Sequence, residues 1–73
     1  MRDHYKTLSL SSAATNAEIR RAYRILARRY HPDVNPGRST AEQFRAISEA
    51  YDVLSHPLKR TAYDQDRELN DTF

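Results

Sequence analysis

The sequence contains no cysteine, a single glycine and no long hydrophobic run among its 73 residues. A small chain from an oxidising compartment usually carries disulfides, so the absence of cysteine indicates a reducing, cytoplasmic environment. The single glycine argues against a β-rich fold and against a phosphate-binding loop, because both consume glycine. No apolar stretch approaches the roughly 20 residues that span a bilayer, and the N-terminus lacks the hydrophobic segment of a signal peptide.

The short length also limits the core that the chain can build. A chain of 73 residues makes one domain, and folding at this size buries only about 60% of the unfolded surface. Such a thin core leaves little room for a buried active site, which argues against an enzyme. We expect residues 1–73 to form a single domain, either a minimal protein or the N-terminal domain of a longer one.

The spacing of apolar residues predicts an all-α fold with four helices. A short first helix is expected over about residues 3–8. A second is expected over about residues 15–30, where Thr15 and Glu18 form a capping box in which each side chain accepts a hydrogen bond from the other residue's backbone amide. Apolar residues then recur every three or four positions until Pro32, which cannot continue a helix.

The same spacing predicts a third helix over about residues 40–54, capped by Ser39 or Thr40, and a fourth over about residues 57–69. Two long helices with matching apolar stripes and a short loop pack antiparallel, so we expect a helical hairpin flanked by the two other helices. The residues expected to point inward from the fourth helix are Leu58, Ala62 and Tyr63. The predicted core consists of Tyr5, Leu8, Ile19, Leu26, Tyr30, Phe44, Ile47, Tyr51, Leu54 and Tyr63.

Basic residues concentrate on the second helix, which carries five arginines but only one acidic residue, Glu18. Three of the arginines recur every four positions and form a row on the face away from the core: Arg20, Arg24 and Arg28. One interpretation is a solvated face that only keeps the helix soluble. Five like charges repel one another, however, so a partner with an acidic surface, protein or nucleic acid, explains them better.

The loop after this helix contains His31, Pro32 and Asp33. Taken alone, the tripeptide is explained by local structure, since proline ends a helix and aspartate forms a side-chain turn with its own backbone. It does not make a metal site, because the other histidines, His4 and His56, belong to other loops or termini and no third ligand converges. No nucleophile stands beside a positioned base. We therefore expect no metal, no cofactor and no catalytic residue.

The order and spacing of these motifs closely resemble the J-domain family. The strongest resemblance runs through the second helix into the tripeptide, over Ala17–Arg24 and Leu26–Asp33. The other resembling residues are Asp3, Tyr5 and Leu8 in the first helix, Phe44, Ile47, Ala50, Tyr51, Val53 and Leu54 in the third, and Lys59–Asp64 in the fourth. Together they cover nearly the whole chain, which makes the resemblance far more specific than the tripeptide alone.

The resemblance implies a hairpin of two long helices with a short helix at each end, which agrees with the apolar spacing. It implies a co-chaperone module that binds a DnaK-type, seventy-kilodalton heat-shock chaperone in its ATP-bound state and stimulates its ATP hydrolysis. Asp33 would engage a chaperone arginine, and Tyr23 would be half-exposed at the edge of the binding face. We expect a monomer without membrane contact. The implied contact residues are Arg20, Tyr23, Arg24, His31, Pro32, Asp33, Asn35 and Arg45.

Some positions depart from the common bacterial pattern of the family. Ile25 stands where a basic residue is frequent, and Val34 stands where arginine is frequent. Ser9 replaces the glycine that usually follows the first helix, and the loop before Ser39 is about one residue short. The tripeptide itself is intact, so these departures bear on the choice of partner rather than on the implied function.

Two rival functions belong to other classes. A nucleic-acid-binding module would use the arginines on phosphates, but the net charge of only +2 and the absence of a recognition-helix pattern argue against it. An assembly adaptor would keep the fold without the trigger, but such an adaptor has no need of the intact tripeptide.

Overall fold

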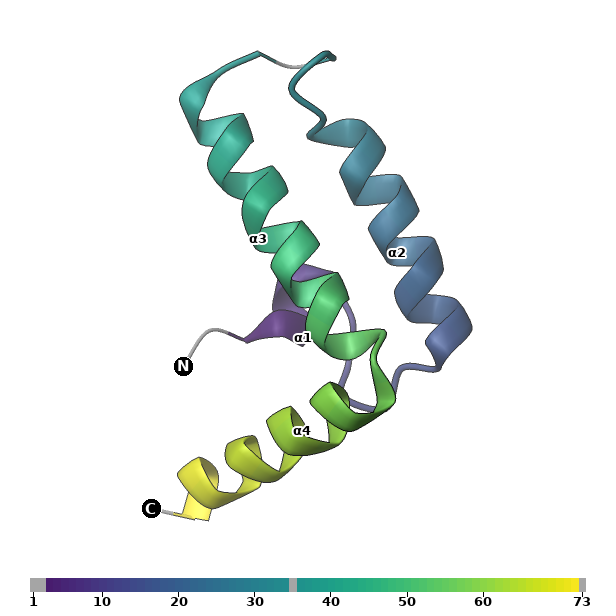
Figure 1. Cartoon of the computed structure of the whole chain (residues 1–73), viewed down its shortest axis with the longest axis vertical. Coiled ribbons are helices and arrows are strands. Elements are labelled where there is room, and N and C mark those ends of the chain that lie inside the picture. The colour runs from purple at the N-terminus through teal and green to yellow at the C-terminus, as the bar shows by residue number, and fades with distance from the viewer. Residues whose placement is uncertain (1–2, 35, 73) are drawn as a thin grey trace.

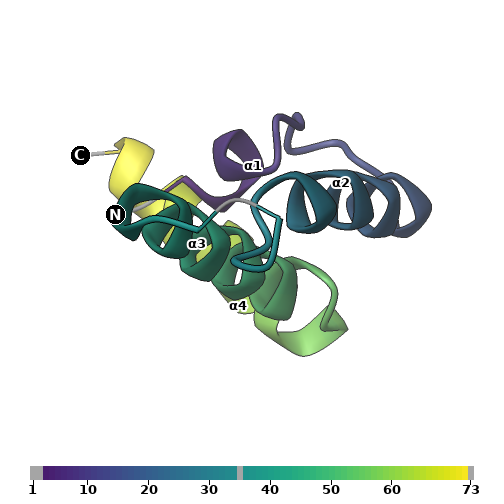
Figure 2. The ribbon, with the colours of Figure 1, turned by 90° about the horizontal axis from the view of Figure 1, so that it is seen from above.

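The computed structural model describes residues 3–34 and 36–72, and these residues form four α-helices. The helices are α1 (His4–Thr7), α2 (Asn16–Arg29), α3 (Arg38–Leu54) and α4 (Pro57–Thr72). Figure 1 shows α2 and α3 as an antiparallel hairpin, with α4 crossing below its open end. Viewed along the hairpin, α1 covers one face of the α2–α3 layer (Figure 2). The predicted all-α hairpin is confirmed, and every helix boundary lies within three residues of its predicted position.

The predicted start of α2 is confirmed, whereas that of α3 is wrong. The Glu18 amide donates to the Thr15 hydroxyl at 3.1 Å, and the Thr15 amide donates to the Glu18 carboxylate at 2.9 Å. The hydrogen bond from the Thr15 amide, followed by that from the Thr15 side chain, lowers the pKa of the Glu18 carboxyl. At α3 the N-cap is Gly37, which makes no side-chain capping bond. Because the helix starts two residues earlier than predicted, Ser39 and Thr40 lie inside its first turn and cannot cap it.

Most of the predicted core is buried where the helices meet. Six of the predicted residues are buried: Tyr5, Leu8, Ile19, Ile47, Leu54 and Tyr63. Three more are partly buried against this core: Leu26, Tyr30 and Tyr51. Phe44 is half-buried near the loop end of the hairpin. Ala14 and Ala50 are buried as well.

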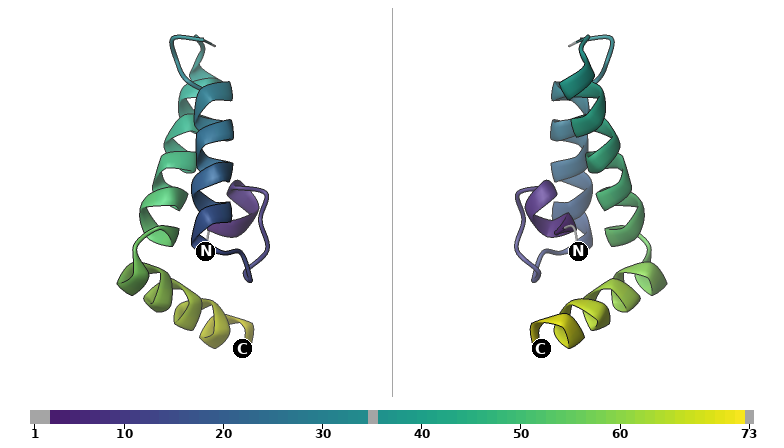
Figure 3. Two further views of the ribbon diagram at one scale, coloured as in Figure 1. Left: turned by 90° about the vertical axis from the view of Figure 1, so that its right-hand side faces the viewer. Right: turned by 90° about the vertical axis from the view of Figure 1, so that its left-hand side faces the viewer.

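The inward face of α4 differs from the prediction. Tyr63 is buried, but Leu58 is 81% exposed and Ala62 is also exposed. Successive residues of an α-helix are turned by about 100°, so a helix that buries Tyr63 turns Leu58 about 140° away from the core. Figure 3 shows that α4 leaves the end of α3 at a steep angle.

His4 is a second correction, because it is a buried residue of α1 rather than part of a loop or terminus. Its ring packs against the ring of Tyr63, with 4.7 Å between the centroids. Its backbone amide donates to the Tyr63 hydroxyl at 2.9 Å. These contacts join residues 59 positions apart in the sequence and attach α4 to α1.

Charged and aromatic side chains of α1 and α4 form what we call the α1–α4 junction, comprising Asp3, Tyr5, Arg60, Asp64 and Arg67. The Tyr5 hydroxyl donates to the Asp64 carboxylate at 2.6 Å and accepts from the Arg60 guanidinium at 3.1 Å. Burial, followed by the hydrogen bond to Asp64, raises the pKa of Tyr5 above its ordinary value. The Arg67 guanidinium lies 3.4 Å from the Asp3 carboxylate and 5.2 Å from the centre of the Tyr5 ring.

Arg60 also fastens the α1–α2 loop to α4. Its guanidinium donates to the Ala14 carbonyl oxygen at 2.7 Å and to the Ser12 carbonyl oxygen at 3.4 Å. A third bond reaches the side chain of Asn16 at the start of α2, at 3.4 Å. The fixed fork of an arginine can satisfy several acceptors at once, so one side chain holds α1, the loop, α2 and α4 together.

The end of α1 is a Schellman motif. The Leu10 amide donates to the Tyr5 carbonyl oxygen at 2.8 Å, and the Ser9 amide donates to the Lys6 carbonyl oxygen at 2.9 Å. Ser9 has φ of 59°, in the left-handed region that glycine adopts at lower cost than other residues. The motif reverses the chain and carries Leu10 back toward α2.

Candidate functional site

The loop end of the hairpin presents its acidic side chain to solvent. We call residues 31–34 the tip. The Val34 amide donates to the His31 carbonyl oxygen at 3.0 Å, which closes a turn around Pro32 and Asp33. The Asp33 side chain is 91% exposed. The turn therefore holds a carboxylate clear of the fold, where a partner can reach it.

The side chain of His31 orders this turn. Its Nδ1 accepts a hydrogen bond from the Asp33 amide at 3.1 Å and lies 3.7 Å from the Asp33 carboxylate. Because Nδ1 is the acceptor, neutral His31 carries its proton on Nε2. The ring also packs edge-on against Phe44 of α3, with 5.5 Å between the centroids. The imidazole thus links the tip to the second helix of the hairpin.

Phe44 is a residue whose role at the site the sequence did not reveal. The apolar spacing assigned it to the core, and the structure shows it half-buried beneath the His31 ring. Its position at the start of the apolar stripe of α3, opposite the end of α2, is the only signal that could have indicated this contact.

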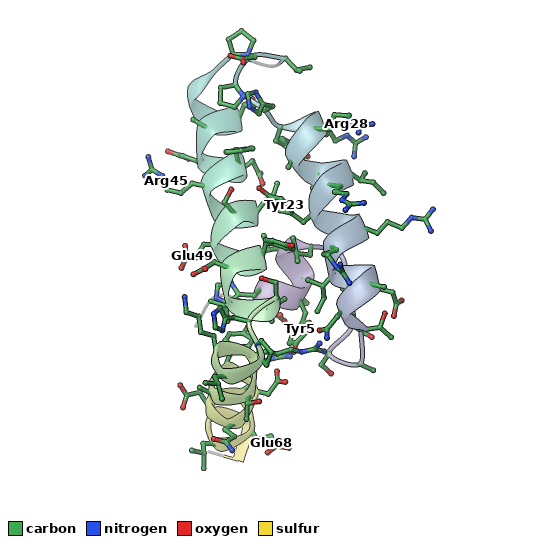
Figure 4. The ribbon with its side chains drawn as sticks, turned by 45° about the vertical axis from the view of Figure 1, so that its right-hand side comes forward. Tyr5, Tyr23, Arg28, Arg45, Glu49 and Glu68 are labelled. Carbon is green, nitrogen blue, oxygen red and sulfur yellow. The ribbon has the colours of Figure 1, made fainter. Side chains whose placement is uncertain are left out.

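The basic side of α2 leads directly into the tip. Arg20 and Arg24 are exposed on the outer side of the helix, as the spacing predicted. Figure 4 shows Arg28 pointing away from α3 and Tyr23 lying between the two long helices. The Tyr23 ring is half-buried and stacks on Tyr51 of α3, with 4.1 Å between the centroids. It therefore has the half-exposed position that was expected of it.

The remaining predicted contact residues lie elsewhere or outside the described residues. Arg45 is exposed on the side of α3 that faces away from α2, so the hairpin does not bring it together with Arg28 (Figure 4). Asn35 lies outside the described residues. The structure thus groups the basic side of α2 with the tip and sets Arg45 apart.

The chemistry of the site is that of recognition. Across residues 3–34 and 36–72, no three histidine, cysteine or acidic side chains gather as metal ligands would. In the same part of the chain, no helix has the length and apolar character needed to cross a membrane. What the site offers is an exposed carboxylate on an ordered turn, next to a row of arginines. Such a surface can bind an oppositely charged pattern and fix its register.

Comparisons with known proteins agree with this geometry. Residues 3–64 match the model of the family described as the DnaJ domain. The chain is 54% identical over 68 residues to "Chaperone protein DnaJ 1" of Mycobacterium leprae (strain TN), a match that covers 93% of this chain and 18% of that protein. It is 56% identical over 69 residues to "Chaperone protein DnaJ 2" of Nocardia farcinica (strain IFM 10152), with the same coverages.

A solved structure shares the fold. The J-Trx1 fragment of ERdj5 superposes with a TM-score of 0.82 at 36% sequence identity, over 89% of this chain and 32% of that one. The chain thus spans less than a fifth of the bacterial relatives and about a third of this structure. The family match covers the hairpin, the tip and the α1–α4 junction up to Asp64. The chain therefore belongs to the DnaJ-domain family.

Proposed function

We propose that this domain is a co-chaperone module that binds a DnaK-type chaperone in its ATP-bound state and stimulates its ATP hydrolysis through the tip. The observation that carries the proposal is the Asp33 carboxylate, held almost fully exposed on a turn that His31 orders. The names of the bacterial relatives, which describe chaperone proteins, support it.

The two parts of the site have different tasks in this proposal. The exposed arginines of α2 steer encounter with an acidic surface and set the orientation, giving an affinity that weakens with salt. Asp33 then pairs with a chaperone arginine and is desolvated at the interface. Loss of one partner from such a pair leaves the other charge stranded, so this contact is expected to dominate the effect on hydrolysis.

Stimulation is allosteric, because the domain supplies no catalytic group. It can favour hydrolysis only by binding the chaperone conformation that leads to the hydrolytic state better than it binds the alternatives. The tip suits this role because its geometry is fixed before binding by His31 and Phe44. Less conformational freedom is then lost when the complex forms.

The test is single-turnover ATP hydrolysis by a DnaK-type chaperone from the same organism, with the domain or its Asp33→Asn variant added. The wild type is expected to accelerate hydrolysis. The variant is expected to lose about 30-fold in stimulation, the equivalent of about 2 kcal/mol. Asp66→Asn, the same change at an exposed position on α4, serves as the matched control and should stimulate normally. A folded wild-type domain without any effect on hydrolysis would rule out the proposal for that chaperone.

A further inference from the structure

An apolar groove lies on the flank of α2 that is turned away from Tyr23. Its volume is about 340 Å³. Carbon-rich side chains from α2 and from the end of α1 line it: Leu8, Leu10, Ala22, Ile25 and Leu26. It therefore has room for one partner side chain of leucine or phenylalanine size, and its lining offers that side chain mostly apolar contact.

Backbone hydrogen bonds fix the wall of the groove that lies opposite α2. The Schellman motif after α1 fixes Leu10 through the hydrogen bond to the Tyr5 carbonyl oxygen at 2.8 Å. Leu8, directly before the motif, is buried against the core and forms part of the floor. The wall opposite α2 is thus held in place, so the groove exists before any partner arrives.

Ile25 is the unusual member of this lining. It is 57% exposed, although an isoleucine on a soluble helix gains by burial. The other large exposed apolar residues among the described ones, Val34, Leu58 and Leu69, do not line this groove. An exposed apolar residue that borders an apolar concavity marks a place where a partner can remove both from water.

The charge around the groove defines the partner's chemistry. Arg21, exposed on the rim, stands one turn before Ile25 and contributes to the positive side of α2. The acidic rim residue, Glu18, already accepts the hydrogen bond from the Thr15 amide at the helix start. The rim thus carries one charge of each sign, and complementarity to an acidic surface comes from the arginine row of α2 beside it. Arg28, the last arginine of the row, stands three residues after Ile25 and neighbours it on the helix surface, so a partner lying along the arginine row reaches the groove at its edge.

We propose that this groove receives an apolar side chain that projects from the acidic surface of the DnaK-type chaperone, and that Ile25 determines which chaperone the domain prefers. The inference rests on the proposed function and adds a specificity contact to it. The arginines attract any acidic surface, whereas the groove selects one that carries an apolar side chain at the matching position. An apolar contact of this kind does not weaken as salt is raised, in contrast to the arginine contacts.

The experiment measures the dissociation constant between the domain and the ATP-bound chaperone of the same organism, at low and at high salt. Ile25→Ser is expected to weaken binding about fivefold at both salt concentrations, because it removes apolar surface from the contact. Arg24→Ser is expected to weaken binding mainly at low salt. Ile25→Leu should bind within about twofold of the wild type, since the lining of the groove keeps an apolar side chain at this position.

Leu58→Ser is the matched control, because Leu58 is also exposed but lies on α4, away from the groove. It should bind like the wild type, and circular dichroism should show that all variants are folded. Unchanged binding by Ile25→Ser, or a loss confined to low salt, would overturn the groove proposal. The proposed function would not be affected by that result, because the hydrolysis assay with Asp33→Asn tests it independently of the groove. Absence of binding by the wild type itself would overturn both.

Discussion

The α1–α4 junction and the tip lie at opposite ends of the hairpin, and their charged groups differ in exposure and in hydrogen bonding. At the junction, Arg60 has a largely covered side chain and bonds to groups from α1, the loop, α2 and α4. At the tip, the Asp33 side chain is 91% exposed, and its carboxylate lies 3.7 Å from Nδ1 of His31. A polar group bonded inside the fold contributes to stability, whereas one held out in solvent is available to a partner.

Because of this difference, the stability of the fold and the effect on a partner depend on opposite ends of the molecule. Substitutions at the junction should change the free energy of unfolding, and substitutions at the tip should change only what the domain does to a partner. The separation is useful in a small domain, because an exposed carboxylate on a loop costs little stability when the opposite end of the hairpin is firmly fixed. Four measurements test this difference between the two ends of the molecule.

The largest effect is expected from Arg60→Ala. It removes hydrogen bonds to Tyr5, Ala14 and Ser12 and leaves carbonyl groups of the loop without this donor. The free energy of unfolding should fall by about 2–3 kcal/mol, measured by urea denaturation followed by circular dichroism. Lys59→Ala is the control, because its bond to Asp52 at 3.0 Å is exposed and should be worth less than about 1 kcal/mol. Equal losses in the two variants would contradict the assigned role of Arg60.

Tyr5→Phe should cost about 1 kcal/mol at neutral pH, since it removes the hydroxyl that links Asp64 and Arg60. The pKa of Tyr5 is raised in the folded state, so its contribution is complete below the ordinary tyrosine pKa and is lost as pH rises through the folded value. Wild type and variant should therefore converge in stability under alkaline conditions, in urea titrations at successive pH values.

The control for this pH dependence is Tyr51→Phe, at a half-buried tyrosine away from the junction. Urea titrations of this variant over the same pH values record the pH dependence of the domain with the junction intact. A gap between wild type and Tyr5→Phe that stays constant with pH would show that the Tyr5 hydroxyl does not titrate as described.

Ser9→Gly should stabilise the domain by about 0.5–1 kcal/mol. Ser9 occupies the left-handed position of the Schellman motif with φ of 59°, where glycine avoids the strain of a side chain. Thermal and urea unfolding should both detect the gain. Ser12→Gly in the same loop has no positive φ to relieve and should lower stability slightly, through the entropy of the unfolded chain. A loss of stability in Ser9→Gly would show that the motif does not strain Ser9.

The smallest effect on stability is expected at the tip. Asp33→Asn should change the free energy of unfolding by less than about 0.5 kcal/mol, because the side chain is exposed and the substitution leaves no buried polar group without a partner. The same protein samples should be used for the hydrolysis assay, so that folding and stimulation are compared directly. A loss of stability as large as that of Arg60→Ala would erase the distinction between the two ends.

Much of the fold was readable in the sequence because helices are encoded locally. The capping box of Thr15 and Glu18 and the stop at Pro32 act within a few residues, and the structure has α2 between them. The apolar stripe of α3 likewise predicted Ile47 and Leu54 as core residues. At the start of α3 the prediction was wrong, because neither of the two predicted caps, Ser39 and Thr40, caps the helix, which begins after Gly37.

The candidate site was predictable only in part. The spacing placed Arg20 and Arg24 on one face and Asp33 in a loop, since both follow from helix geometry and from proline. The contact of Phe44 with the His31 ring, and the position of Arg45 on the far side of α3, depend on how two helices are rotated against each other. Helix periodicity alone does not give that rotation.

The four helices, the pairing of two of them as a hairpin and the place of the tripeptide in a loop were predictable from the amino-acid sequence, because they depend on propensity, capping and apolar spacing along the chain. Three features depend on how the helices pack: Leu58 of α4 is turned outward, His4 is buried, and Ser9 and Leu10 line a groove beside Ile25. These features join residues as far apart as 59 positions. Their geometry is set by which faces pack together, and that choice is made by the whole core at once.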